Sequence, residues 1–119
     1  LKKTTIRELI TLIYHSKLFI GLDSGPSHIS ASLGVPSIIF FGAVNPVFRH
    51  FSELFNGVFM QEKCEFNGCY HEVILDTKGP ACKLVGDEGI PKCSVHSTMD
   101  VIANAQKLLA AQTADINEK

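Results

Sequence analysis

A carboxylate, a hydroxyl, a glycine and an imidazole stand together in the stretch Asp23-Ser24-Gly25-Pro26-Ser27-His28. A hydroxyl and an imidazole can donate hydrogen bonds to phosphate oxygens, whereas a carboxylate accepts them from sugar hydroxyls. Gly25 allows a ligand to approach the backbone, and amides at the start of a following helix favour an anion. The set suits a sugar diphosphate, although Asp, Ser and Gly are also ordinary turn and N-cap residues.

A serine-hydrolase site fits these residues less well. A nucleophile elbow requires Gly-x-Ser-x-Gly, whereas here Gly21 stands three positions before Ser24 and Gly25 follows it directly. The sequence also offers Ser24 and His28 no third partner nearby.

The flanking sequence predicts a parallel sheet beneath this stretch. The apolar runs 18–22 and 37–41 lack alternation, which is typical of strands buried on both faces. Between them, Pro26 suits the first turn of a helix and Gly34 suits its C-terminal end. Strand, short helix and strand indicate a βαβ unit with parallel strands. Ligands bind beyond the carboxyl ends of such strands, where Asp23 is expected.

Three further elements complete the prediction. A helix over 5–16 begins with a capping box of Thr5 and Glu8, a short strand covers 57–61, and a helix spans 98–111. The expected fold class is α/β, part of a Rossmann-like parallel-sheet lobe. We divide the chain into a Rossmann-like nucleotide-sugar-binding part (1–61), a Cys-rich irregular segment (62–96), a C-terminal helix (97–112) and a flexible tail (113–119).

Composition limits the class of partner. The 119 residues carry a formal net charge of -1 and are 45% hydrophobic, which suits a globular protein and gives no reason to expect nucleic acid as a partner. No apolar run is long enough for a membrane span, and the first residues lack the core of a secretion signal. We expect a cytoplasmic location, at most peripheral at the inner membrane face, and a chain that begins inside a larger protein.

Four cysteines, Cys64, Cys69, Cys82 and Cys93, lie in the irregular segment. Their spacing is not that of two Cys-x-x-Cys pairs. Four thiolates in a reducing compartment nevertheless suit a structural tetrahedral site for zinc or iron. Disulfides would require an oxidising compartment, and separate buried thiols are a third alternative.

Four ordered motifs between residues 4 and 46 resemble a known family. They are Thr4-Thr5-Ile6-Arg7-Glu8-Leu9, Asp23-Ser24-Gly25-Pro26-Ser27-His28, Gly34-Val35-Pro36 and Phe41-Gly42-Ala43-Val44-Asn45-Pro46. In this order they resemble the C-terminal lobe of family 9 glycosyltransferases, the ADP-heptose:lipopolysaccharide heptosyltransferase group. The segment 93–109 also resembles the family's closing cysteine and helix.

The resemblance implies a GT-B architecture of two Rossmann-like lobes, with an ADP-heptose-like nucleotide sugar bound in the C-terminal one. It implies inverting transfer without a catalytic metal or other cofactor, to a lipopolysaccharide-type glycan, another glycan or a protein. The donor-binding residues that it implies are Asp23 for sugar hydroxyls, Ser24, Gly25 and His28 for the diphosphate and neighbouring sugar, and Thr4 and Thr5 for the base.

The family's catalytic base and acceptor site lie in the N-terminal lobe, and its basic phosphate clamp lies upstream of Leu1. The resemblance therefore implies that this chain holds no catalytic residue, needs its N-terminal lobe as a partner, and alone binds the donor weakly without catalysis. Two alternatives stay open. One is a non-enzymatic, metal-stapled interaction module in which the turn at Asp23 is only structural. The other is a nucleotide-sugar hydrolase or epimerase, because a fold does not determine the reaction.

Overall fold

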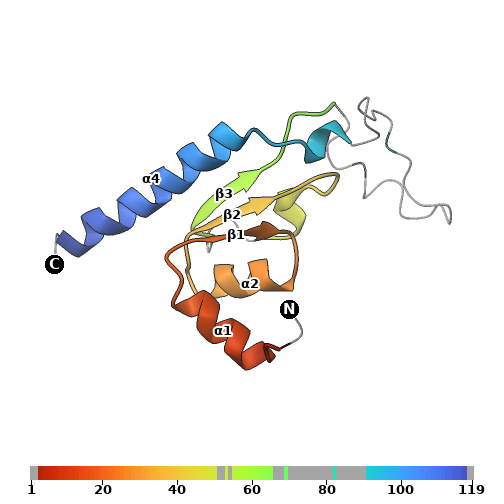
Figure 1. The fold of residues 1–119 in the computed structure, drawn as a ribbon. Helices are drawn as coiled ribbons and strands as arrows, with labels where there is room; N and C mark the ends of the chain where they lie inside the picture. The colour runs from red at the N-terminus through yellow and green to blue at the C-terminus, as the bar shows by residue number, and fades with distance from the viewer. Residues whose placement is uncertain are drawn as a thin grey trace.

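The computed structural model describes residues 3–50, 53, 55–65, 69, 82 and 91–117, with the backbone alone for 113–117. The helices and strands are α1 (Ile6–Tyr14), β1 (Phe19–Leu22), α2 (Gly25–Ser32), β2 (Ser37–Phe40), β3 (Gly57–Met60) and α4 (Thr98–Asn117). Two short 3₁₀ helices are η1 (Pro46–Phe48) and η2 (Lys92–Ser94). The order of these elements confirms the α/β class (Figure 1).

The three strands form one parallel sheet in the order β1-β2-β3, as the βαβ pattern predicts. Ser37 of β2 pairs with Phe19 of β1 on one side and with Gly57 of β3 on the other. Because the strands are parallel, their carboxyl ends lie at one edge of the sheet, toward which all three arrows point in Figure 1.

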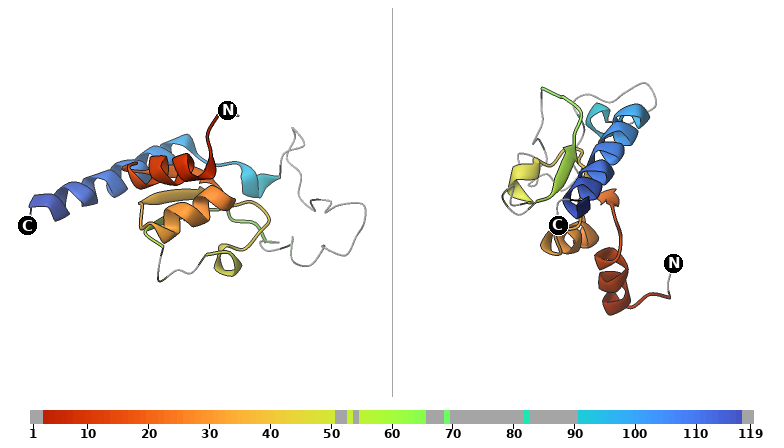
Figure 2. Two further views of the ribbon diagram at one scale, coloured as in Figure 1. Left: turned by 90° about the horizontal axis from the view of Figure 1, so that it is seen from below. Right: turned by 90° about the vertical axis from the view of Figure 1, so that its left-hand side faces the viewer.

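Helices α2 and α4 cover opposite faces of this sheet (Figure 1 and Figure 2). On one face, the Ser37 hydroxyl donates to Ser30 of α2 at 3.0 Å, and both side chains are fully buried. On the other face, the Asn104 amide of α4 lies 3.6 Å from the Met60 sulfur of β3. Small serine side chains let α2 pack closely on β2, which positions the start of α2 at the carboxyl edge.

The core lies around β2. Ile38 and Ile39 are both 0% exposed, on opposite faces of the strand. β1 differs from the prediction that both of its faces are buried, because Ile20 is 47% and Leu22 68% exposed. The helix on that face, α4, packs over β2 and leaves these β1 side chains uncovered by the described residues.

The predicted capping box at the start of α1 is confirmed. The Glu8 carboxylate accepts the Thr5 backbone N–H at 2.7 Å, and the Thr5 hydroxyl accepts the Glu8 N–H at 3.3 Å. The Thr5 N–H, foremost, and the Thr5 hydroxyl, which donates to the Glu8 carboxylate at 2.8 Å, lower the pKa of Glu8. The capping box thereby occupies the N–H groups of Thr5 and Glu8, two of the four orphan amides at this helix start.

The other helix ends follow their sequence signals less closely. α2 begins at Gly25, one residue before the predicted Pro26, and Gly34 just beyond it has a φ of 67° that favours glycine. α4 continues to Asn117, past the predicted end at 112, because the sequence contains no glycine or proline there. None of the described helices has both the length and the hydropathy needed to cross a bilayer.

Candidate functional site

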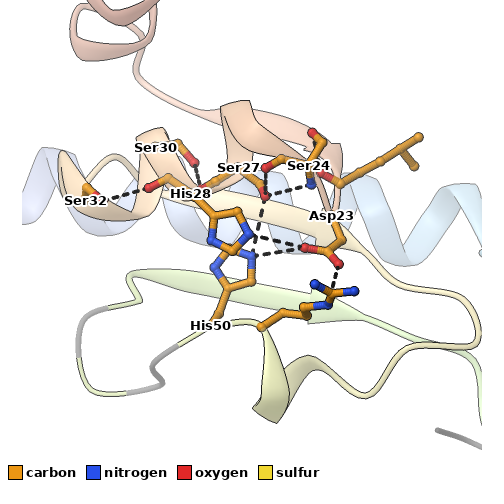
Figure 3. Close-up of polar contacts among 9 residues, drawn as sticks. Asp23, Ser24, Ser27, His28, Ser30, Ser32 and His50 are labelled. Carbon is orange, nitrogen blue, oxygen red and sulfur yellow. Dashed lines mark hydrogen bonds and ion pairs between the residues drawn. The ribbon is translucent and has the colours of Figure 1, made fainter. Parts of the chain in front are cut away.

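Asp23 lies directly after β1, at the carboxyl edge of the sheet, and collects three nitrogen partners (Figure 3). Its Oδ1 atom is 3.6 Å from His28 Nε2 and 3.7 Å from His50 Nε2. Its Oδ2 atom is 3.6 Å from Arg49 Nε. The carboxylate is only 17% exposed, so solvent screens these contacts weakly. The partners come from α2 and from the segment after η1. We call Asp23, His28, Arg49 and His50 the Asp23 cluster.

The backbone amides at the start of α2, which the sequence suggests as an anion site, are mostly occupied within the chain. The N–H groups of Ser27 and His28 donate to the Ser24 carbonyl at 3.0 and 3.4 Å. Pro26 has no N–H. Among the described contacts, none uses the N–H of Gly25. The helix start therefore offers an anion one backbone amide, that of Gly25.

Gly25 itself is not required by packing. A Cβ built on Gly25 meets no atom within 4 Å, and its φ is not in the positive region. The neighbouring Ser24 hydroxyl is exposed and donates back to the Leu22 carbonyl at 3.1 Å. The open space beside the Gly25 amide would admit a phosphate oxygen, and the exposed Ser24 hydroxyl would have to turn away from the Leu22 carbonyl to donate to it.

His50 forms the buried side of the cluster. Its side chain is 2% exposed and lies among the rings of Phe41, Phe55 and Phe59, at centroid distances of 6.0, 5.7 and 5.5 Å. Its ring stacks on His28 at 4.3 Å with an interplanar angle of 7°. Burial, and then the charge of His28, lower the pKa of His50, while Asp23 opposes this shift. His50 is therefore neutral near neutral pH.

Asp23, His28 and His50 have the composition of a metal site, and their ligand atoms lie within 4.8 Å of one another. The ring orientation argues against a shared ion. An imidazole lone pair lies in the plane of its ring, and two parallel planes stacked at 4.3 Å do not contain a common ligand position. A metal here would require one of the two rings to turn.

Arg49 and His50 are members of the Asp23 cluster that lie outside the motifs, and the sequence alone gave no reason to choose them as site residues. His50 lies 23 residues after Ser27, yet its Nε2 atom is 3.4 Å from the Ser27 hydroxyl. The available signal was topological: the segment after β2 and the segment after β1 leave the same edge of a parallel sheet. Polar residues following the predicted strand 37–41 were therefore candidates.

Thr4 and Thr5 lie apart from the Asp23 cluster. Among the described residues, no hydrogen bond or ion pair joins either threonine to the cluster, and the Thr5 hydroxyl is bonded to Glu8 at 2.8 Å. Thr4 borders a surface hollow of about 480 Å³, lined by Lys3, Thr4, Arg7, Glu8, Thr11 and Leu12. The start of α1 lies at the same end of the molecule as the start of α2 (Figure 1).

A second hollow, of about 460 Å³, lies at the carboxyl edge on the α4 face of the sheet. Its lining residues are Leu22, Phe40, Phe41, Gly42, Ser94, His96, Thr98 and Val101. The His96 ring contacts Phe40 at 4.9 Å, and its buried Nδ1 atom has no hydrogen-bond partner in the described part of the chain. The Asp23 cluster does not line this hollow.

The four cysteines are all among the described residues, although much of segment 62–96 is not. None of them is in a disulfide, and Cys93 is buried. Burial raises the pKa of Cys93, a hydrogen bond to Ser94 lowers it, and the charges of Cys64, Cys82 and Cys69 raise it further. The three thiols therefore lie close enough to act on Cys93, although no three sulfur atoms lie within 4.8 Å of one another.

Comparison with known proteins identifies one family. Residues 1–68, more than half of the chain, match the family described as glycosyltransferase family 9 (heptosyltransferase). Over 46 residues the chain is 50% identical to lipopolysaccharide heptosyltransferase 3 of Escherichia coli and 52% identical to that of strain K12. The matched stretch is 39% of this chain but only 14% and 13% of those relatives.

No solved structure matches the chain. The family match covers α1, the whole sheet and the Asp23 cluster, so it includes the motifs on which the resemblance rests. The chain belongs to glycosyltransferase family 9, the heptosyltransferase family.

Proposed function

We propose that this chain is the donor-binding part of a bacterial heptosyltransferase of lipopolysaccharide biosynthesis. It would bind an ADP-heptose-like donor for inverting transfer to a lipopolysaccharide-type or other glycan acceptor, together with an N-terminal lobe that supplies the catalytic base. The two relatives named for this activity and the family match support the proposal. A cytoplasmic location, where ADP-sugars are available, is part of it.

The observation that carries the proposal is the Asp23 cluster beside the start of α2. A diphosphate at this edge would meet the Gly25 amide, the Ser24 hydroxyl and the two exposed cationic groups, His28 when protonated and Arg49. Asp23 would accept hydrogen bonds from the sugar hydroxyls. The nucleotide end of the donor would contact Thr4 and Thr5. Thr4 lines its hollow together with Lys3 and Arg7.

Replacing Asp23 with Asn tests the proposal. We expect Asp23→Asn in the intact enzyme to weaken ADP-heptose binding by about tenfold or more, because a charged acceptor for sugar hydroxyls is lost. Binding of ADP, which lacks that sugar, should change less. Asp100→Asn, an exposed change at the start of α4, is the matched control.

Calorimetric titration with each ligand measures these effects. Equal ADP-heptose affinity in wild type and Asp23→Asn contradicts the sugar-binding role. Analysis of the products formed from ADP-heptose separates transfer from hydrolysis or epimerisation, because free heptose or an isomerised nucleotide sugar identifies the alternative reactions.

We also propose that the four cysteines hold one structural zinc or iron ion. Support comes from their composition and from the electrostatic effect of three thiols on the buried Cys93. The segment after β2 lies close to Cys93, since a Cβ built on Gly42 would be 4.0 Å from the Cys93 sulfur. An ion would have to draw the sulfur atoms together to about 3.8 Å, the separation that tetrahedral zinc–thiolate bonds impose.

Native mass spectrometry and elemental analysis test the metal proposal. We expect one zinc or iron ion per chain, lost in Cys93→Ser and retained in the neighbouring control Ser97→Ala. A metal-free wild-type protein, purified without chelator and under reducing conditions, contradicts it.

A further inference from the structure

None of the ligand contacts proposed above involves His50, yet it is the most buried member of the Asp23 cluster. Its backbone N–H donates to the Pro46 carbonyl at 3.0 Å, so η1 sets the position of the residue. Three phenylalanine rings surround the imidazole, and its Nε2 edge faces Asp23 and Ser27. A purely structural filler of this aromatic site would be expected to be apolar, because burying a polar ring has a cost.

The hydrogen bonds of Ser27 determine which nitrogen of His50 carries the proton. The Ser27 hydroxyl donates its one proton to the Ser24 carbonyl at 2.7 Å and accepts the Ser24 N–H at 3.1 Å. Its contact with His50 Nε2 at 3.4 Å therefore requires the nitrogen to be the donor. The Asp23 carboxylate, the other neighbour of Nε2, is also an acceptor. Both partners select the neutral tautomer with hydrogen on Nε2.

The charges around the two histidines favour one proton rather than two. His28 and His50 share the same carboxylate oxygen of Asp23, and their rings are stacked, so two positive charges would repel each other. The remaining charged group that the structure joins to this carboxylate is Arg49, on its other oxygen. His28 is 48% exposed whereas His50 is 2% exposed. The buried ring, His50, is therefore the one that stays neutral.

We propose that His50 is a positioning residue for donor binding: a neutral Nε2–H imidazole that supports the His28 ring by stacking and orients the Asp23 carboxylate. This inference rests on the donor site proposed above. The exposed His28 ring then faces the diphosphate. His50 does not touch the ligand, and acts through His28 and Asp23.

The substitution His50→Phe keeps a stacked aromatic ring in an aromatic surrounding but removes the N–H donor. We expect ADP binding to weaken by about three- to tenfold, the effect of one lost hydrogen bond on the ordering of the site. Of the two described partners of Asp23 Oδ1, His28 then remains, so the pH profile of ADP binding should differ from that of wild type. ADP titrations between about pH 5.5 and 8.5, where imidazoles titrate, measure both effects. His15→Phe, at an exposed histidine after α1, is the control.

The outcomes separate the two proposals. Failure of wild type to bind ADP contradicts the donor site and this inference with it. Equal affinity and an equal pH profile in wild type and His50→Phe contradict this inference alone. Should the variant not fold, long-range ¹H–¹⁵N spectra of wild type still decide, because a His50 ring protonated on Nδ1, or on both nitrogens at neutral pH, overturns the proposal.

Discussion

The substitution Gly25→Ala tests whether glycine is needed at this position for folding or for ligand binding. The position is the first residue of α2, its φ is ordinary, and a Cβ there meets no atom within 4 Å. Replacing glycine by alanine at such a position reduces the entropy of the unfolded chain and stabilises by about 0.4–1 kcal/mol. For a domain of this size that corresponds to a rise in melting temperature of roughly 2–4 °C.

The same methyl group should impair anion binding. It would stand beside the Gly25 N–H, the one amide of the α2 start that no described contact occupies. Loss of one hydrogen bond to a charged phosphate corresponds to about a ten- to hundredfold weaker affinity. We therefore expect a protein that is more stable and binds ADP less well.

Thermal unfolding followed by circular dichroism, with calorimetric ADP titration on the same samples, measures both effects. Gly34→Ala is the matched control with the opposite pattern, because its φ of 67° strains an alanine and should lower stability while leaving ADP affinity unchanged. If Gly25→Ala binds ADP as wild type does, no phosphate approaches this amide. If Gly25→Ala melts well below wild type, the space around Gly25 is not large enough for a methyl group.

Three further changes test the packing and the electrostatics. Gly57→Ala would bring a Cβ onto the Ser37 carbonyl at a φ of 155°, so urea denaturation should reveal a loss above about 3 kcal/mol, and a wild-type midpoint would contradict the β2–β3 contact. Thr5→Ala breaks the capping box with Glu8 and should cost about 0.5–2 kcal/mol in the same assay, whereas no change would mean that α1 does not depend on it. Because the pKa of His50 is lowered in the folded state, its contribution to stability is present above pH 6.5, the ordinary value, and is lost as pH falls through the folded pKa. The slope of unfolding free energy against pH in this window should decrease in His50→Phe, and an unchanged slope would show that another group is responsible.

Local signals predicted the elements of this chain well. Three kinds of signal act through neighbours in sequence: the Thr5–Glu8 pair, the glycine at position 34 and the two apolar runs. The helix ends and strands that they specify can therefore be predicted without knowing the tertiary structure. The exposure of β1 was not predictable in the same way. An apolar run specifies a strand, but which of its faces a helix covers depends on where α4 packs, and α4 is remote in sequence.

The candidate site was predictable in part for the same reason. Asp23 and His28 belong to one short motif, and their 3.6 Å approach follows from a strand end followed by a helix start. Arg49 and His50 follow another strand, and no periodicity marks them. Their contact with Asp23 depends on the parallel pairing of β1 with β2, which brings the two following segments to one edge.

A carboxylate at the start of a helix would ordinarily repel a diphosphate. In the Asp23 cluster, neighbouring cationic groups offset this repulsion. The net charge of the whole chain is -1, so attraction of an anion has to come from the site itself. Arg49 balances the charge of Asp23, and His50, held neutral by its burial, adds none. The balance then depends on His28: with a neutral ring the cluster is uncharged, and with a protonated ring it is a cation beside the Gly25 amide. Attraction of a diphosphate would therefore come from the exposed side of the cluster, with the buried, neutral His50 supporting the His28 ring from beneath without touching the ligand.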